Sequence, residues 1–273
     1  MSSYFNFDTN VKEESQSSER SEIYFDPDCA VFAGHYPEHP IFPASLLCDF
    51  CLEQVGPASD GHWWIEEATF SAPIRPGDAV NLVREREAER QNFTFMRQSE
   101  VVAKMSLSPR TGVPELLQTV SPSTVALRPA AAHLPQSYPL IAVDRVGVCE
   151  ETGEGAAQKL VSFGDYFFSN IAPGALPKAL YPSGPVIEGI EQAASVSLGR
   201  IWEMDDPSKV IQVAALRGIA IAAQAAPGEV IDFHAKVTLQ SDKLALLTGY
   251  AAVGARLLVS IEKIYVVRLE AGS

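Results

Sequence analysis

Three acid–base side chains stand out because each lies in a segment that is otherwise apolar or turn-forming. His35 lies in Gly34-His35-Tyr36-Pro37, between an expected strand end and an expected helix start. Asp49 and Glu188 each follow a proline by six residues, within apolar runs of helical spacing. Histidine titrates near neutral pH, which suits a general base. A charged group on an apolar helix face is costly unless it serves a purpose, so Glu188 is a candidate for proton transfer.

The elements that would hold these side chains occur twice along the chain. An apolar helical run begins after Pro43 and another after Pro182, and proline with serine near a first turn is a helix-start signal. Strand-like tails follow both helices and contain matched Pro-Gly-acid turns at residues 75–78 and 226–229. Such turns between alternating β-formers favour hairpins in an antiparallel sheet. The repeat therefore predicts an α+β protein made of two similar units.

A stretch rich in proline, alanine and serine separates the two units and is interpreted as a linker. The N-terminal residues are rich in serine and glutamate, which favours a flexible lead-in. The expected organisation is a flexible segment at 1–20, a first unit at 21–120, a linker at 121–133 and a second unit at 134–270.

Composition limits the classes of function. The 273 residues carry a formal net charge of −13, which disfavours nucleic acid as a partner. No apolar run is long enough to span a bilayer and no secretory signal precedes the first unit, so no membrane association is expected. The four cysteines form no disulfide framework, which favours a cytoplasmic protein; Cys48 and Cys51 are interpreted as packed hydrophobes. No motif indicates a cofactor, nucleotide or metal.

Two segments of the sequence carry a family likeness. FAGHYPEHPIFPASLLCDF, at residues 32–50, resembles the signature of bacterial β-hydroxyacyl-[acyl carrier protein] dehydratases. LPQSYPLIAVDRV at 134–146 and PSGPVIEGIEQAA at 182–194 are similar to the opening segment and central helix of the same family. The resemblance implies a double hot-dog: two antiparallel sheets, each wrapped around a central helix, forming an intramolecular pseudo-dimer.

The resemblance also implies which residues act together. In family dimers each site takes its histidine from one unit and its acid from the other. Transferred to this chain, one site combines His35 as base with Glu188 as acid. The other would combine Ile171, at the position of the histidine, with Asp49. That second site lacks a base and is expected to be degenerate.

Further roles follow from the same match. The backbone N–H at Ala44 would polarise the thioester carbonyl, with Gly184 as the facing residue at the start of the second helix. Gln192, one helical turn after Glu188, would either orient that carboxyl or simply pack beside it. Tyr36 and Phe168 are expected to line the acyl channel.

The implied function is dehydration of a 3-hydroxyacyl thioester, carried by acyl carrier protein or coenzyme A, in fatty acid, polyene or polyketide biosynthesis. Three alternatives remain open: a dehydratase that also isomerises the double bond, a hot-dog thioesterase, and an inactive acyl-chain-binding partner of a synthase. A homodimer of double hot-dogs is a further expectation.

Overall fold

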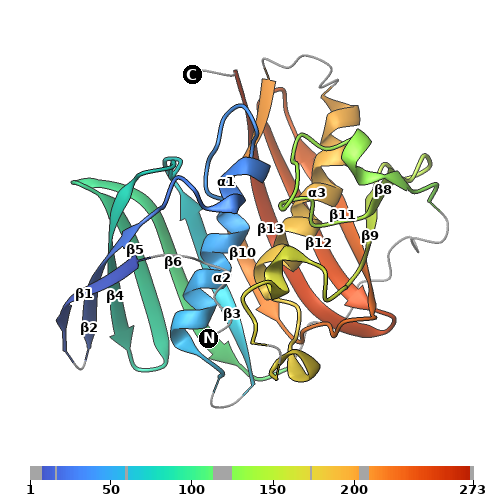
Figure 1. The fold of residues 1–273 in the computed structure, drawn as a ribbon. Coiled ribbons are helices and arrows are strands. Elements are labelled where there is room, and N and C mark those ends of the chain that lie inside the picture. The colour runs from blue at the N-terminus through green and yellow to red at the C-terminus, as the bar shows by residue number, and fades with distance from the viewer. Residues whose placement is uncertain are drawn as a thin grey trace.

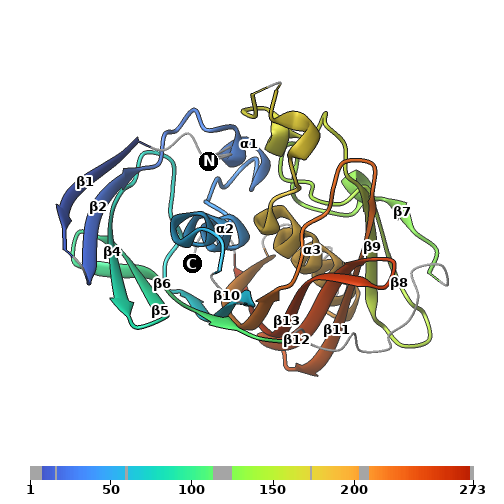
Figure 2. The same cartoon turned by 90° about the horizontal axis from the view of Figure 1, so that it is seen from below.

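One continuous antiparallel sheet curves around two long helices (Figures 1 and 2). The computed structural model describes residues 8–15, 17–58, 61–112, 125–172, 174–202 and 209–270. Within these residues 13 strands follow the order β1-β2-β4-β5-β6-β3-β10-β13-β12-β11-β9-β8-β7. No helix in the described ranges is long and apolar enough to cross a membrane.

The first unit supplies one end of the sheet and one long helix. Its strands are β1 (Asp8–Glu14), β2 (Ser18–Tyr24), β3 (His62–Phe70), β4 (Ala79–Glu87), β5 (Arg90–Arg97) and β6 (Glu100–Arg110). Its helices are the short α1 (Ala30–Gly34) and the longer α2 (Ala44–Val55).

The second unit supplies the other end of the sheet and the longest helix. Its strands are β7 (Arg128–Pro129), β8 (Arg145–Val148), β9 (Gly155–Leu160), β10 (Lys209–Ile221), β11 (Val230–Gln240), β12 (Leu244–Val253) and β13 (Arg256–Glu270). Its helices are α3 (Ser183–Ile201) and the short 3-10 turns η2 (Ala130–Ala132), η3 (Tyr166–Phe168) and η4 (Leu176–Lys178).

The internal repeat is visible in the strand order. The two units meet where β3 pairs with β10, with Ile65 opposite Ile219 and Glu67 opposite Arg217. Outward from this junction come β6, β5 and β4 on one side and β13, β12 and β11 on the other. Each unit thus wraps one long helix with strands joined in the same sequence, which is the predicted pseudo-dimer.

The matched Pro-Gly-acid turns are present, but they do not close hairpins. In both turns the glycine has a positive φ, 83° at Gly77 and 93° at Gly228, a conformation that favours glycine. The following acid accepts a hydrogen bond from a backbone N–H of its own turn, Asp78 from Arg75 and Glu229 from Ala226. The turns lead into β4 and β11, which are not neighbours of β3 and β10. The predicted hairpins at these two places are therefore wrong, because each turn ends a crossover within its unit.

Of the expected flexible lead-in at 1–20, residues 1–7 and 16 lie outside the described part of the chain, and most of the remainder forms strands. Residues 8–14 form β1, which pairs with β2, and β2 pairs with β4. In β2, Ser21 and Ile23 are buried while Tyr24 is exposed, so the strand has one face on the core. Of the expected linker, residues 121–124 lie outside the described part of the chain, and 128–132 form β7 and η2.

Close packing holds the helices on the sheet. A Cβ atom at Gly189 would overlap the ring of Phe233 on β11, and one at Gly249 on β12 would overlap Ile190. Small residues at these places let α3 lie directly against the strands. On α2, Cys48 and Cys51 are fully buried free thiols, in agreement with their interpretation as packed hydrophobes.

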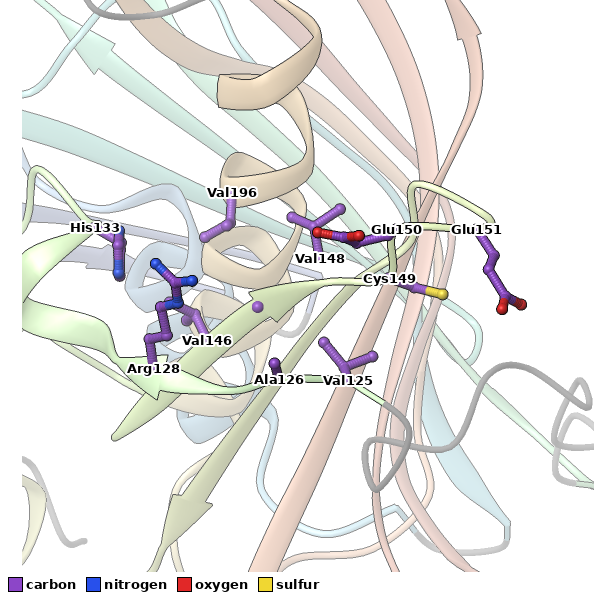
Figure 3. Close-up of a pocket in the computed structure, with 11 residues that line it drawn as sticks. Val125, Ala126, Arg128, His133, Val146, Val148, Cys149, Glu150, Glu151 and Val196 are labelled. Carbon is purple, nitrogen blue, oxygen red and sulfur yellow. The ribbon is translucent and has the colours of Figure 1, made fainter.

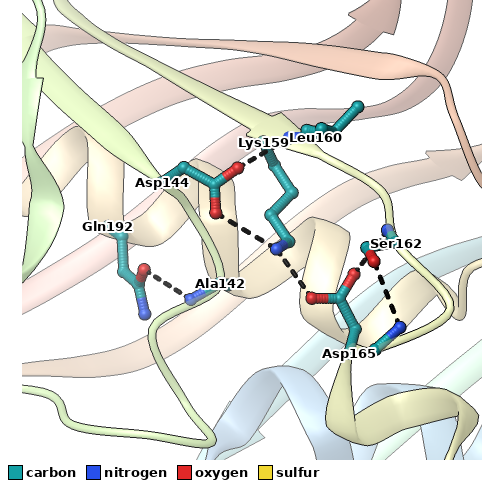
Figure 4. Close-up of polar contacts among 8 residues, drawn as sticks. Ala142, Asp144, Lys159, Leu160, Ser162, Asp165 and Gln192 are labelled. Atoms are coloured by element: carbon teal, nitrogen blue, oxygen red, sulfur yellow. Dashed lines mark hydrogen bonds and ion pairs between the residues drawn. The ribbon is translucent and has the colours of Figure 1, made fainter.

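An ion-pair cluster holds the segment at 134–146 against the rest of the second unit (Figure 4). The Lys159 ammonium lies 3.1 Å from an Asp144 carboxylate oxygen and 2.8 Å from one of Asp165. Asp144 also accepts a hydrogen bond of 2.8 Å from the backbone N–H of Leu160. Because the Lys159 side chain is largely buried, removing both acids would leave a poorly solvated charge.

Candidate active site

The Glu188 carboxyl is buried where α2 and α3 cross. Only 2% of the residue is exposed. The Ser45 hydroxyl donates to its Oε2 at 2.6 Å, and the Gln192 amide donates to its Oε1 at 3.0 Å. A longer contact of 3.4 Å joins the Gln136 amide nitrogen to the same Oε1. Donors from three separate segments therefore hold this carboxyl in one orientation.

Gln192 connects this carboxyl to the 134–146 segment (Figure 4). Its amide nitrogen also donates to the Leu140 carbonyl at 2.6 Å. Its amide oxygen accepts from the backbone N–H of Ala142 at 3.0 Å. All of these groups are buried, so the side chain is fixed at both ends. Of the two roles expected for Gln192, this geometry favours orienting Glu188 over passive packing.

His35 lies at the end of α1, in a loop that closes on itself. Its backbone carbonyl accepts from the Ile41 N–H at 2.8 Å, and its Nδ1 lies 3.1 Å from the Ile41 carbonyl oxygen. A carbonyl can only accept, so Nδ1 carries the proton in the neutral ring. The lone pair is then on Nε2, which leaves that atom able to take a proton.

Tyr36 contacts His35 and lies near Glu188. Its ring stacks on the His35 ring with centroids 4.1 Å apart. Burial raises the pKa of the Tyr36 hydroxyl, and the charges of Glu188 and Glu191 raise it further. Tyr36 is therefore in contact with His35 and within the electrostatic reach of Glu188, although the two residues belong to different units.

A direct contact between the units positions the histidine loop. The Ser137 N–H donates to the Gly34 carbonyl at 2.9 Å, and its hydroxyl donates to the Ala33 carbonyl at 3.0 Å. A Cβ atom at Gly34 would lie 2.6 Å from the Ser137 carbonyl oxygen. Only glycine fits beneath this crossing backbone, which explains the glycine that precedes His35.

The two helix starts have different surroundings. Ala44 is the first residue of α2, where the helix offers no acceptor for a backbone N–H, and it directly precedes the Ser45 that binds Glu188. Gly184, the second residue of α3, lies on the other side of the crossing. A Cβ atom there would be 2.7 Å from the Asp49 Cβ. Gly184 thus packs directly against Asp49 of the other unit.

The second constellation expected from the sequence pairs Asp49 with Ile171. Asp49 on α2 is 4% exposed. Ile171 is half-buried and packs against the hydrophobic core. Phe168, expected to line the channel, is buried against Tyr181 and Phe163 in this part of the second unit.

Three side chains near the site were not identified from the sequence. Ser45 looked like a helix-start residue, and its hydrogen bond to Glu188 depends on how the helices cross. Gln136 belongs to the recognised 134–146 segment, whose docking onto Glu188 has no local signal. Glu191 could have been found, because a second acid three residues after Glu188 must lie near it on a helix.

A separate pocket of about 570 Å³ opens on the second unit (Figure 3). Arg128 and His133 line it together with Cys149, Glu150 and Val196. Neither His35 nor Glu188 belongs to its lining. In the described part of the chain, no group of three His, Cys, Asp or Glu side chains is placed to hold a metal ion.

The known sequences that this chain resembles are dehydratases. A family model described as ApeI-like, ApeI dehydratase, matches residues 11–107. A 3-hydroxyacyl-[acyl-carrier-protein] dehydratase FabZ from Chlamydia trachomatis is 30% identical over 134 residues, covering 49% of this chain and 86% of the relative. FabZ from Novosphingobium aromaticivorans is 28% identical over 128 residues, covering 47% of this chain and 79% of the relative.

Solved structures match almost the whole chain. The dehydratase domain of the polyketide PpsC from Mycobacterium tuberculosis gives a TM-score of 0.70 at 11% identity, covering 95% of this chain and 97% of that one. The dehydratase domain from the CurJ module of curacin polyketide synthase gives 0.71 at 12% identity, covering 96% and 98%. At these identities the likeness shows the fold, a double hot-dog.

Proposed function

This chain belongs to the 3-hydroxyacyl-[acyl-carrier-protein] dehydratase family, and we propose that it dehydrates 3-hydroxyacyl thioesters at one composite site. The observation that carries this proposal is the arrangement around Glu188. A buried carboxyl from the second unit is oriented by three donors, beside a tyrosine that stacks on a histidine from the first unit. Paired acid and base groups in one enclosed place are what removal of water requires.

The proposed reaction assigns each group one step. Nε2 of His35 takes the proton from C2, and the C–H electron pair becomes the C2–C3 double bond. The C3–O bond breaks, and Glu188 gives its proton to the departing oxygen, which leaves as water. The Ala44 N–H, at the start of α2, faces the thioester oxygen and stabilises the negative charge that develops there.

The carrier and the location of the protein are part of the proposal. Family membership supports an acyl carrier protein or coenzyme A thioester as substrate, in fatty acid or polyketide biosynthesis. Four buried free cysteines support a reducing compartment, hence the cytoplasm. A homodimer of double hot-dogs is compatible with β1 and β7 being the outermost strands of the sheet in the described part of the chain.

The test is to incubate the purified protein with 3-hydroxyacyl chains of increasing length, on carrier protein and on coenzyme A. Mass spectrometry should detect loss of one water from the thioester, and His35→Ala should abolish it. A free acid as product would indicate a thioesterase, and a migrated double bond would indicate an isomerising dehydratase. Absence of turnover on every substrate would instead favour an inactive chain-binding partner.

A further inference from the structure

A second carboxyl, Glu191, lies beside the acid site and is not explained by the proposed reaction. It follows Glu188 by three residues on α3, so both project toward the same side of the helix. Its Oε1 is shielded from solvent and has no hydrogen-bond partner among the described residues. A buried carboxylate oxygen without a donor is costly, whereas a protonated carboxyl tolerates this environment far better.

The surroundings of Glu191 disfavour its negative charge. Burial raises the pKa of Glu191 well above its ordinary value, and the nearby Glu188 charge raises it further. The other titratable groups that interact with its charge are Tyr36, on the loop after α1, and Cys48 on α2. Each of these three neighbours is neutral or negative. His35 stacks on Tyr36 and becomes positive only when it takes a proton.

Glu188, in contrast, is surrounded by donors. Both of its oxygens accept hydrogen bonds, from Ser45 on one side and from the Gln136 and Gln192 amides on the other. Such a carboxyl is well placed to be an acceptor, yet the reaction requires it to donate a proton. The proton that Glu188 is to donate must therefore be held near it between turnovers.

We propose that Glu191 is a positioning residue that shares one proton with Glu188 and so keeps the acid ready to donate. The proposal rests on the dehydratase function proposed above. Two neighbouring carboxyls resist losing their last shared proton, because both would then be negative. When Glu188 protonates the departing hydroxyl, the pair passes from one proton to none. It regains a proton through solvent while His35 releases the one taken from C2.

The first experiment is the pH profile of kcat/KM for the wild type, Glu191→Gln and Glu53→Gln. In Glu191→Gln the fall in activity on the alkaline side should begin about one pH unit or more earlier, so activity there is about tenfold lower. Activity at acidic pH should stay close to that of the wild type. Glu53→Gln is the matched control, because Glu53 is a half-buried helical acid whose neighbour is Asp49, and its alkaline limb should not move. An unchanged limb in Glu191→Gln, or an equal shift in both variants, would overturn the proposal.

The second experiment does not depend on turnover. Carbon-13 NMR of glutamate-labelled protein should show one carboxyl resonance, absent in Glu191→Gln, that titrates far above the ordinary range. In Glu188→Gln the midpoint of that resonance should fall, because the neighbouring charge is gone. A midpoint that stays in place would contradict proton sharing even if the wild type proved inactive. The expected high midpoint and its fall in Glu188→Gln, found together with an inactive wild type, would instead refute only the dehydratase proposal.

Discussion

Where α2 and α3 cross, the same pair of positions has been used in two different ways. The second residue of each helix meets the sixth residue of the other, Ser45 with Glu188 and Gly184 with Asp49. Ser45 donates a hydrogen bond to Glu188, whereas the Gly184 backbone packs closely against the Asp49 side chain. One turn later the helices carry Gln192 and Glu53, respectively an amide donor to Glu188 and a carboxyl that repels Asp49.

The loop that carries His35 also differs from the loop that carries Ile171. The sequence match pairs His35 with Ile171 of the second unit, and Ile171 packs against the hydrophobic core. Both sides of the pseudo-twofold crossing therefore carry a buried acid, and the Ser45 and Gln192 donors hold the one on α3, Glu188. The comparison teaches that shape is maintained by the small and apolar residues of the crossing. Chemistry depends on a few polar substitutions within it.

The largest expected effect comes from the residues of the proposed site acting as a unit. His35→Ala and Glu188→Gln should each lower kcat/KM by about 10²–10⁴-fold. The double variant should lose little more than either single variant, because each group is useless without the other. Ile171→Ala, the matched change on the other side, should retain activity. Losses that simply multiply in the double variant would mean that the two residues serve separate sites.

Ser45→Ala tests the hydrogen bond that distinguishes the two sides. Removing one donor from a buried acceptor costs about 1–2 kcal/mol, which should lower kcat by about tenfold with little change in KM. Ser45→Thr retains the hydroxyl and should recover most of the rate. If Ser45→Ala were as active as the wild type, the orientation of Glu188 would not depend on this contact.

Gly184→Ala tests the close packing on the other side. A Cβ atom 2.7 Å from Asp49 Cβ and 3.0 Å from Leu46 must push the helices apart, at a cost of about 1–3 kcal/mol in unfolding free energy. Gly199→Ala is the control on the same helix, since no atom of the described residues lies within 4 Å of its Cβ position. That change should stabilise the protein by about 0.5–1 kcal/mol. Equal effects in urea unfolding would show that Gly184 is not a contact point.

Glu53→Gln should have the smallest effect, visible only as a pH dependence of stability. Burial, and then the Asp49 charge, raise the pKa of Glu53 from 4.5 to about 7. The folded state holds this proton more tightly, so stability falls as pH rises from about 4.5 to 7. Glu53→Gln should therefore be more stable than the wild type above pH 7, by on the order of 1 kcal/mol after solvent screening, and equal to it near pH 4. Denaturant unfolding at both pH values measures this; a constant difference would exclude titration as the cause.

The sequence was sufficient for the fold class and for the internal repeat, because the helix starts and their acids recur at the same spacing. It was insufficient for contacts between units. The Ser45–Glu188 hydrogen bond and the placement of Gly184 beside Asp49 both depend on the crossing of two helices, which no local pattern encodes. The connections of the strands were misjudged for a related reason. A Pro-Gly turn reports local backbone geometry and does not reveal which strands it joins.

The most direct test of a single composite site is to compare Glu188→Gln with Asp49→Asn in the mass-spectrometric dehydration assay. The two acids occupy equivalent positions in α3 and α2 and are similarly buried, at 2% and 4% exposure. We expect Glu188→Gln to lose turnover by about 10²-fold or more and Asp49→Asn to keep it. Loss of turnover in Asp49→Asn with activity retained in Glu188→Gln would contradict the account and move the site to the opposite side of the crossing.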